Sequence, residues 1–193
     1  SVQVPHGRTP AGATAVKRML PDHLVICYQG DGDLAAIGTA EAVHAANRGE
    51  KFTTIFVNNA IYGMTGGQMA PTTLVGQKAT TAPYGRDPVE AGMGYPIRVL
   101  EMLATLGGTK YLARGAVNNA ANVRKTKQYI KKAFEAQMRG EGSSMVEILS
   151  QCPTNWAMDP VDSVGWVESA MMPFYALGEV KNELAGAGKE AGK

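Results

Sequence analysis

The chain has 193 residues, a formal net charge of +2 and 45% hydrophobic residues. This length suits one α/β domain of ordinary size that can bury its own core. The small net charge gives no argument for a nucleic-acid partner or a membrane surface, and no apolar run reaches the length of a membrane span. With only two cysteines, Cys27 and Cys152, the chain is not a disulfide scaffold, so we expect a reduced, cytoplasmic setting.

The first half of the chain alternates between predicted helices and strands. A helix is predicted over residues 11–20, followed by a β-rich strand over residues 23–28. An Ala-rich helix is then expected over residues 34–47, and a second strand over residues 52–57. This strand–helix–strand order is typical of a parallel sheet.

The second half continues the alternation after a long loop. A helix is expected over residues 97–106, and a longer one begins after Asn119 or Asn122 and ends at Met138. Strands are predicted over residues 110–117 and 144–150, and Asp159 with Pro160 favours a last helix start. Residues 185–193 are expected to be a disordered tail. Together these elements predict one α/β domain over residues 1–193, with a mainly parallel sheet flanked by helices.

Polar residues follow the first two predicted strands. Gly30, Asp31, Gly32 and Asp33 come directly after the first, and Asn58-Asn59 ends the second. Ligands bind at the carboxyl ends of parallel strands, so these residues are expected to share one site. Mg²⁺ prefers carboxylate, amide and carbonyl oxygens together with substrate phosphates.

The spacing therefore predicts a diphosphate held through a metal ion. Asp31 would supply a carboxylate, Asn59 its amide oxygen and Ile61 its backbone carbonyl. Gly30 and Gly32 would let the backbone approach a phosphate, next to the N–H groups of the following helix. The loop from Tyr62 to Thr73, rich in glycine, is expected to continue this site, with a plain surface loop as the alternative.

Two motifs give the chain a resemblance to a known family. Gly30-Asp31-Gly32 with Asn58-Asn59 resembles the thiamine-diphosphate motif. The run from Asn58 to Thr73, with Tyr62-Gly63-Met64-Thr65-Gly66-Gly67-Gln68 and Pro71-Thr72-Thr73, is similar to the β (thiamine-diphosphate-binding) subunit of 2-oxoacid:ferredoxin oxidoreductases. The resemblance extends from His6-Gly7-Arg8 to Cys152-Pro153-Thr154-Asn155-Trp156.

The resemblance implies a set of site residues. His6 is expected near the reacting end of the cofactor, as the catalytic candidate; the alternative is a histidine in a polar loop. Tyr62 would cover the cofactor, Thr65 would donate to phosphate and Met64 would line the thiazolium ring or merely pack. The residues expected to bind the cofactor are Gly30, Asp31, Gly32, Asp33, Asn59, Tyr62, Gly63, Met64, Thr65 and Gly66.

The implied reaction is oxidative decarboxylation of a 2-oxoacid to its acyl-CoA, with electrons passing to ferredoxin. The implied partners are an α subunit that supplies the activating glutamate, further γ or δ subunits, ferredoxin and coenzyme A. The chain alone is expected to be inactive. The segments at residues 38–41 and 152–156 look most like subunits assigned to branched-chain acids such as 2-oxoisovalerate. A 2-oxoglutarate enzyme, a non-redox thiamine decarboxylase or synthase, and a bare binding module are the alternatives.

The cysteines carry the prediction about iron and sulfur. By resemblance, Cys152 corresponds to one ligand of a [4Fe–4S] cluster, whose other family ligands lie in an upstream segment that is not in this sequence. The chain therefore looks N-terminally truncated. A cubane cluster normally needs four thiolates, so this chain should not hold one alone. Cys27 is interpreted as a small buried hydrophobe.

His44, Arg86 and the long loop that contains Arg86 are interpreted from their place in the sequence. His44, near the end of its predicted helix, is expected to be structural. The loop over residues 74–96 is expected to face the substrate or a partner subunit, because long loops often carry function. Arg86 in this loop has two open interpretations, a partner for a substrate carboxylate or an exposed arginine.

Overall fold

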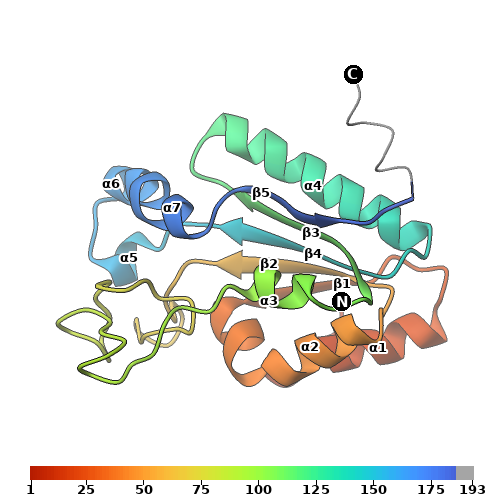
Figure 1. Cartoon of the computed structure of the whole chain (residues 1–193), viewed down its shortest axis with the longest axis horizontal. Helices are drawn as coiled ribbons and strands as arrows, with labels where there is room; N and C mark the ends of the chain where they lie inside the picture. The colour runs from red at the N-terminus through yellow and green to blue at the C-terminus, as the bar shows by residue number, and fades with distance from the viewer. Residues whose placement is uncertain (186–193) are drawn as a thin grey trace.

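Four parallel strands and one antiparallel edge strand form a single sheet in the order β1-β2-β4-β3-β5 (Figure 1). The computed structural model describes residues 1–185, so most of the predicted tail lies outside the described residues. The strands are β1 (Ile26–Gly30), β2 (Thr53–Asn58), β3 (Thr109–Ala116), β4 (Ser143–Leu149) and β5 (Gly178–Asn182). The mainly parallel sheet is confirmed. The sequence missed β5, a half-exposed, mostly polar edge strand that lacks the apolar alternation of a strand.

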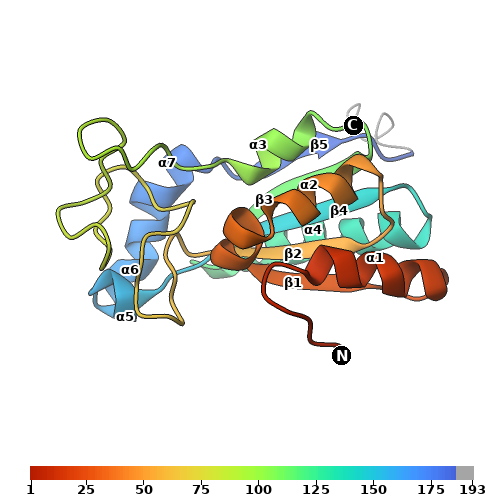
Figure 2. The same cartoon turned by 90° about the horizontal axis from the view of Figure 1, so that it is seen from below.

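Helices cover both faces of the sheet. Figures 1 and 2 show α4 (Ala120–Met138) on one face, and α1 (Thr9–Met19), α2 (Thr39–Asn47) and α3 (Val99–Ala104) on the other. Of the two candidate caps of α4, Asn119 is the cap, and its side chain accepts the N–H of Asn122. Within the described residues, no helix combines the length and the apolar character needed to cross a bilayer.

The strands alternate their buried side chains between two cores. Phe56, Leu112 and Met145 face the side of α2 and α3, whereas Ile55 and Val146 face α4. A third cluster lies beyond the carboxyl ends of the strands, where α5 (Pro153–Trp156), α6 (Pro160–Trp166), η2 (Val167–Met171) and α7 (Met172–Phe174) pack on the loops. The aromatic side chains of these helices and of the residue after them, Trp156, Trp166, Phe174 and Tyr175, therefore pack within the chain itself. Asp159 caps α6 as predicted, by accepting the N–H of Val161.

The predicted helix over residues 34–47 is wrong in one respect, because it is divided at Gly38. A π-helical turn, η1 (Asp33–Ile37), precedes α2. The backbone of Gly7 packs against this break, and a Cβ on Gly38 would lie 2.8 Å from the Gly7 carbonyl oxygen. Close packing of the N-terminal segment, which periodicity cannot reveal, therefore accompanies the break.

The first strand also begins later than predicted, at Ile26 rather than His23. The ammonium group of Lys17 donates to the carbonyl oxygens of Pro21 and His23, both at 2.7 Å. These contacts hold residues 21–23 in a turn, so the chain becomes extended only after it.

Candidate metal and phosphate site

The carboxyl ends of the parallel strands align at one edge of the sheet. In register, Gly30 of β1 pairs with Val57 of β2, and Asn58 pairs with Leu149 of β4. The segments that follow these strands therefore emerge together, and Figure 1 shows the loops after β2 and helices α5 to α7 at this end. The predicted convergence of the two motifs is what parallel pairing requires.

The two side chains predicted as metal ligands meet at one backbone amide. The N–H of Ile61 donates to Asp31 Oδ2 (3.1 Å) and to Asn59 Oδ1 (3.3 Å). Asp31 also accepts the hydroxyl of Thr72 (3.0 Å) and the N–H of Gly32 (2.8 Å). A carboxylate oxygen, an amide oxygen and the Ile61 backbone are thus brought together.

The charge of Asp31 is poorly compensated in the metal-free chain. The side chain is buried, and burial raises the pKa of its carboxyl to about 6, against the lowering effect of hydrogen bonds from Thr72, Gly32 and Ile61. Within residues 1–185, no ion pair to Asp31 is found. A buried carboxylate that lacks a cation is what a metal site requires, so the residues present fit Mg²⁺.

The two glycines of the motif have different surroundings. A Cβ on Gly30 would meet nothing within 4 Å, whereas one on Gly32 would lie 2.8 Å from the ring of Tyr62. The backbone at Gly30 therefore borders open space, as a phosphate approach needs, and Gly32 makes room for the tyrosine. Burial and the nearby Asp31 charge raise the pKa of Tyr62.

The loop after Ile61 folds back on itself. The N–H of Tyr62 donates to the Gln68 carbonyl (2.9 Å), and Gly66 and Gly67 have φ angles of +107° and +83°, which explains the glycine pair. Tyr62 and Gly63 lie at the site. Met64, Thr65 and Gly66 form the exposed tip of the loop, where Met64 is fully exposed, so the structure does not bring these three to the packed site.

Asp33 has a different position from Asp31. Its carboxylate accepts the N–H of Gly7 (2.6 Å) and the amide of Gln29 (2.5 Å), and it pairs with Nδ1 of His6 (2.8 Å). It therefore anchors the N-terminal segment beside the Gly30–Gly32 turn. His6 remains largely exposed and lies at this end of the sheet.

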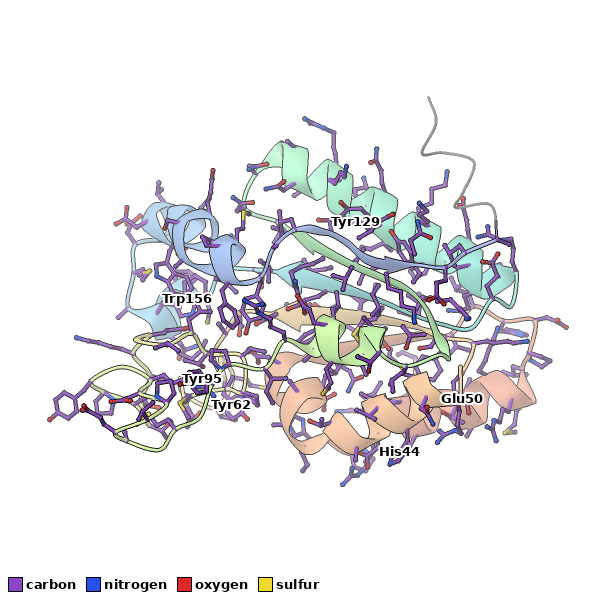
Figure 3. The ribbon with its side chains drawn as sticks, in the orientation of Figure 1. His44, Glu50, Tyr62, Tyr95, Tyr129 and Trp156 are labelled. Carbon is purple, nitrogen blue, oxygen red and sulfur yellow. The ribbon has the colours of Figure 1, made fainter. Side chains whose placement is uncertain are left out.

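Cys152 lies against the glycine loop. A Cβ on Gly63 would be 3.4 Å from its sulfur, and Asn155 Nδ2 donates to both the Gly63 carbonyl (2.9 Å) and the Cys152 sulfur (3.3 Å). Nε1 of Trp156 donates to the Asn59 carbonyl (3.1 Å). The segment from Cys152 to Trp156 thus closes over the Asn58-Asn59 loop, and Figure 3 shows Trp156 and Tyr62 at this same end of the molecule.

The remaining cysteine prediction agrees with the structure. Cys27 is buried in β1, and burial raises the pKa of its thiol to about 12, so it is an unreactive core residue. Across the described part of the chain, no group of three or more His, Cys, Asp or Glu side chains could hold a metal. The candidate Mg²⁺ site differs from such a group because only one of its three ligands is a carboxylate.

Both interpretations of Arg86 are wrong. Its side chain is buried, and its guanidinium donates to backbone carbonyl oxygens of two segments, residues 70–73 and 93–95. Nε, Nη1 and Nη2 of Arg86 all donate to carbonyl oxygens of the chain, so the side chain is neither exposed nor available to a substrate carboxylate. No sequence pattern indicates this role, because the carbonyl partners are brought together only by the fold of the loop.

The chain is similar to known proteins in both sequence and fold. The family profile described as "Thiamine pyrophosphate enzyme, C-terminal TPP binding domain" matches residues 1–148. The ketoisovalerate oxidoreductase subunit VorA of Methanothermobacter thermautotrophicus is 51% identical over 159 residues, which are 82% of this chain and 33% of that protein. The chain therefore spans about a third of the length of this relative.

Two other relatives point in the same direction. The 2-oxoglutarate synthase subunit KorB of Methanocaldococcus jannaschii is 40% identical over 174 residues, covering 87% of this chain and 59% of that protein. A solved 2-oxoglutarate:ferredoxin oxidoreductase from Magnetococcus marinus, with 2-oxoglutarate, coenzyme A and succinyl-CoA bound, has a TM-score of 0.70 and 33% identity, over 84% of this chain and 50% of that one. The resemblance of the motifs to 2-oxoacid:ferredoxin oxidoreductases is confirmed.

Proposed function

The chain belongs to the thiamine pyrophosphate enzymes, matching their C-terminal TPP-binding domain, and we propose that its 193 residues form one domain that holds thiamine diphosphate through Mg²⁺. Asp31, Asn59 and the carbonyl of Ile61 would hold the metal. Gly30 and the start of the helical segment that follows it would face the diphosphate. Tyr62 and Gly63 would border the cofactor, and the tip of the loop, Met64 to Gly66, would reach it or a partner.

One observation carries this proposal more than any other. The Asp31 carboxylate is buried beside the Asn59 amide oxygen, at a shared N–H, without a cationic side chain among the described residues. Burying an uncompensated charge is costly, and a divalent cation supplied with a diphosphate would remove that cost.

For the whole enzyme, we propose oxidative decarboxylation of a 2-oxoacid to acyl-CoA, with electrons passing to ferredoxin. When bound, thiamine diphosphate supplies the electron sink that this decarboxylation needs. This chain's residues would bind and orient the cofactor, and His6, held by Asp33, would stand near the reacting end. Cys152 would join cysteines of an upstream segment to ligate a [4Fe–4S] cluster. An α subunit would supply the activating glutamate, and γ or δ subunits would complete the complex.

The substrate we propose is a branched-chain 2-oxoacid such as 2-oxoisovalerate. Support comes from the identity to a ketoisovalerate oxidoreductase subunit, 51%, against 40% to a 2-oxoglutarate synthase subunit. A 2-oxoglutarate enzyme is the second candidate, favoured by the solved neighbour with 2-oxoglutarate bound. A non-redox thiamine enzyme is less favoured, because Cys152 lies within contact distance of the predicted cofactor loop at Gly63.

The first experiment is calorimetric titration of the chain with thiamine diphosphate, with and without Mg²⁺, for the wild type and Asp31→Ala. We expect binding that requires Mg²⁺ and is weakened at least a hundredfold in the variant, because one metal ligand is lost. Asp22→Ala removes the same charge from an exposed turn at the opposite end of β1 and should leave affinity unchanged.

Two results would contradict the metal site. Tight binding that ignores both Mg²⁺ and Asp31 would show that the diphosphate is held in another way. Equal affinity for thiamine and thiamine diphosphate in the presence of Mg²⁺ would show that the diphosphate is not recognised.

The open space beside Gly30 gives a separate prediction. We expect Gly30→Ala to change the free energy of unfolding by less than about 0.5 kcal/mol, since the added methyl group meets no protein atom. We expect it to weaken binding of thiamine diphosphate at least tenfold, because the methyl group fills the space that a phosphate approaches. Urea unfolding and calorimetric titration measure the two effects, and unchanged affinity would remove Gly30 from the cofactor site.

A further inference from the structure

A buried polar network links the ends of three neighbouring strands. Asn58 of β2, Arg114 of β3 and Glu147 of β4 are all at most 1% exposed. The Glu147 carboxylate accepts Nε of Arg114 at Oε2 and Nδ2 of Asn58 at Oε1, each at 2.7 Å. A buried ion pair of this kind seldom adds net stability, so its presence asks for another explanation.

Glu147 determines how the amide of Asn58 is oriented. A carboxylate only accepts hydrogen bonds, so the NH₂ group of Asn58 must face it. The amide oxygen then faces the other way, where it accepts the N–H of Ala60 at 3.0 Å. Both ends of the Asn58 amide are thereby satisfied in one orientation only.

Ala60 has an unusual backbone conformation. Its φ is +57°, in the left-handed region that residues with a Cβ rarely adopt. Its N–H donates to Asn58, and its carbonyl oxygen accepts the hydroxyl of Thr73 (2.7 Å) and the amide of Gln77 (3.0 Å). Ala60 lies between Asn59 and Ile61, so its conformation sets the directions of both candidate ligands.

We propose that Asn58 and Glu147 are positioning residues for the metal site. Glu147 orients the Asn58 amide, and Asn58 holds Ala60 in the left-handed turn that directs the Asn59 side chain and the Ile61 backbone towards Asp31. Neither residue would ligate the metal. This inference rests on the proposed Mg²⁺–diphosphate function and adds how the chain preorganises that site.

The network contains its own control residue. Glu101 contacts the same guanidinium through Nη1 (2.9 Å) and Nη2 (2.7 Å) of Arg114, whereas Glu147 accepts Nε. Its side chain is 38% exposed. Glu101→Gln therefore perturbs the same arginine without touching the amide of Asn58.

The test measures Mn²⁺ affinity of the full 193-residue chain with thiamine diphosphate present, by electron paramagnetic resonance. Mn²⁺ replaces Mg²⁺ as the probe, and the readout needs no catalytic activity. We expect Asn58→Ala to weaken Mn²⁺ binding at least tenfold. Glu147→Gln should weaken it three- to tenfold, because either a donor then faces Arg114 or the Asn58 amide must turn. Glu101→Gln should stay within twofold of the wild type.

A rescue separates positioning from general structural support. Glycine adopts positive φ without help from a neighbouring side chain. Adding Ala60→Gly to Asn58→Ala should therefore bring Mn²⁺ affinity back to within threefold of the wild type. If Asn58→Ala does not fold, Asn58→Ser replaces it. The serine hydroxyl can accept the N–H of Ala60 only weakly, so its affinity should be intermediate and also rescued by glycine.

The possible results are distinguishable. If the wild type binds Mn²⁺ but the folded Asn58 and Glu147 variants bind it equally well, the positioning inference is overturned and the proposed function stands. Failure of Ala60→Gly to rescue a folded Asn58 variant overturns it as well. If the wild type itself binds neither Mn²⁺ nor thiamine diphosphate, the proposed function fails, and the inference with it.

Discussion

Replacing Asp31 with asparagine is expected to stabilise the metal-free chain while removing Mg²⁺-dependent binding of thiamine diphosphate. Burial raises the pKa of Asp31 to about 6, so the folded chain binds this proton more tightly than the unfolded chain does. The free energy of unfolding contributed by this group therefore falls as the pH rises from about 4 to about 6, and the full cost is present above that. That cost corresponds to about 3 kcal/mol.

Asparagine carries no charge, so it avoids this cost at neutral pH. Both oxygens of Asp31 accept hydrogen bonds, whereas the NH₂ group of asparagine is a donor and would face one of the same donors. This unfavourable contact reduces the gain in stability to about 2 kcal/mol. We expect the difference between the variant and the wild type to be near zero at pH 4.5 and to reach its full size at pH 8. Urea unfolding in the presence of a chelator, at several pH values, measures it.

Adding Mg²⁺ and thiamine diphosphate should reverse the order. The wild type gains stability from binding, whereas Asp31→Asn should not. Asp22→Asn, at an exposed turn, is the control and should follow the wild type in both conditions. A variant less stable than the wild type at pH 8 without metal would mean that the hydrogen bonds of Asp31 outweigh its burial.

Much of the fold follows from the sequence because it depends on local patterns. Runs such as Phe52 to Val57 consist of aromatic and β-branched residues, which favour strands. The caps Asn119 and Asp159 form hydrogen bonds to residues only two or three positions further along the chain. The errors occur where distant segments decide the outcome. The predicted helix is divided where Gly7 packs against Gly38, and β5 pairs with the edge of β3, which lies far from it in the sequence.

The site divides in the same way. The convergence of Asp31 and Asn59 could be predicted because parallel strands place their carboxyl ends together, so spacing along the chain predicts proximity in space. The supporting residues were missed. Thr72 reaches Asp31 from 41 residues away, and Glu147 reaches Asn58 from 89 residues away. A single sequence therefore predicts which strand ends meet more readily than it predicts the distant residues that hydrogen-bond to them.

Arg86 is the residue for which we expect the largest loss of stability. Its guanidinium makes hydrogen bonds to six carbonyl oxygens, among them those of Thr73 (2.7 Å), Gly94 (2.8 Å) and Tyr95 (2.9 Å). It thereby joins residues 70–73, which carry the hydroxyl groups bonded to Asp31 and to the Ala60 carbonyl, to residues 93–95. The planar fork of five N–H donors is suited to this arrangement.

Lysine cannot replace that fork, because its three donors radiate from one nitrogen atom. We expect Arg86→Lys to lower the free energy of unfolding by about 2 to 3 kcal/mol, and Arg86→Met by about 3 to 5 kcal/mol, since buried carbonyl groups lose their donors. Hydrogen exchange should increase over residues 70–97, and affinity for Mg²⁺ and thiamine diphosphate should fall as Thr72 and Thr73 lose their support. Urea unfolding, exchange measured by mass spectrometry and calorimetry test the three expectations.

Arg98 provides the matched control. Its exposed guanidinium lies over the ring of Phe174 at 4.3 Å, in the same part of the chain, and Arg98→Lys should cost less than about 1 kcal/mol. If Arg86→Lys were equally mild, its six carbonyl contacts would not be what holds the loop. If it lowered stability without any change in exchange over residues 70–97, the loop would be held by other contacts. A loss of metal affinity together with faster exchange would show that the Arg86 guanidinium stabilises the site indirectly. It would do so by holding the segment that carries Thr72 and Thr73, without a bond to the predicted ligands.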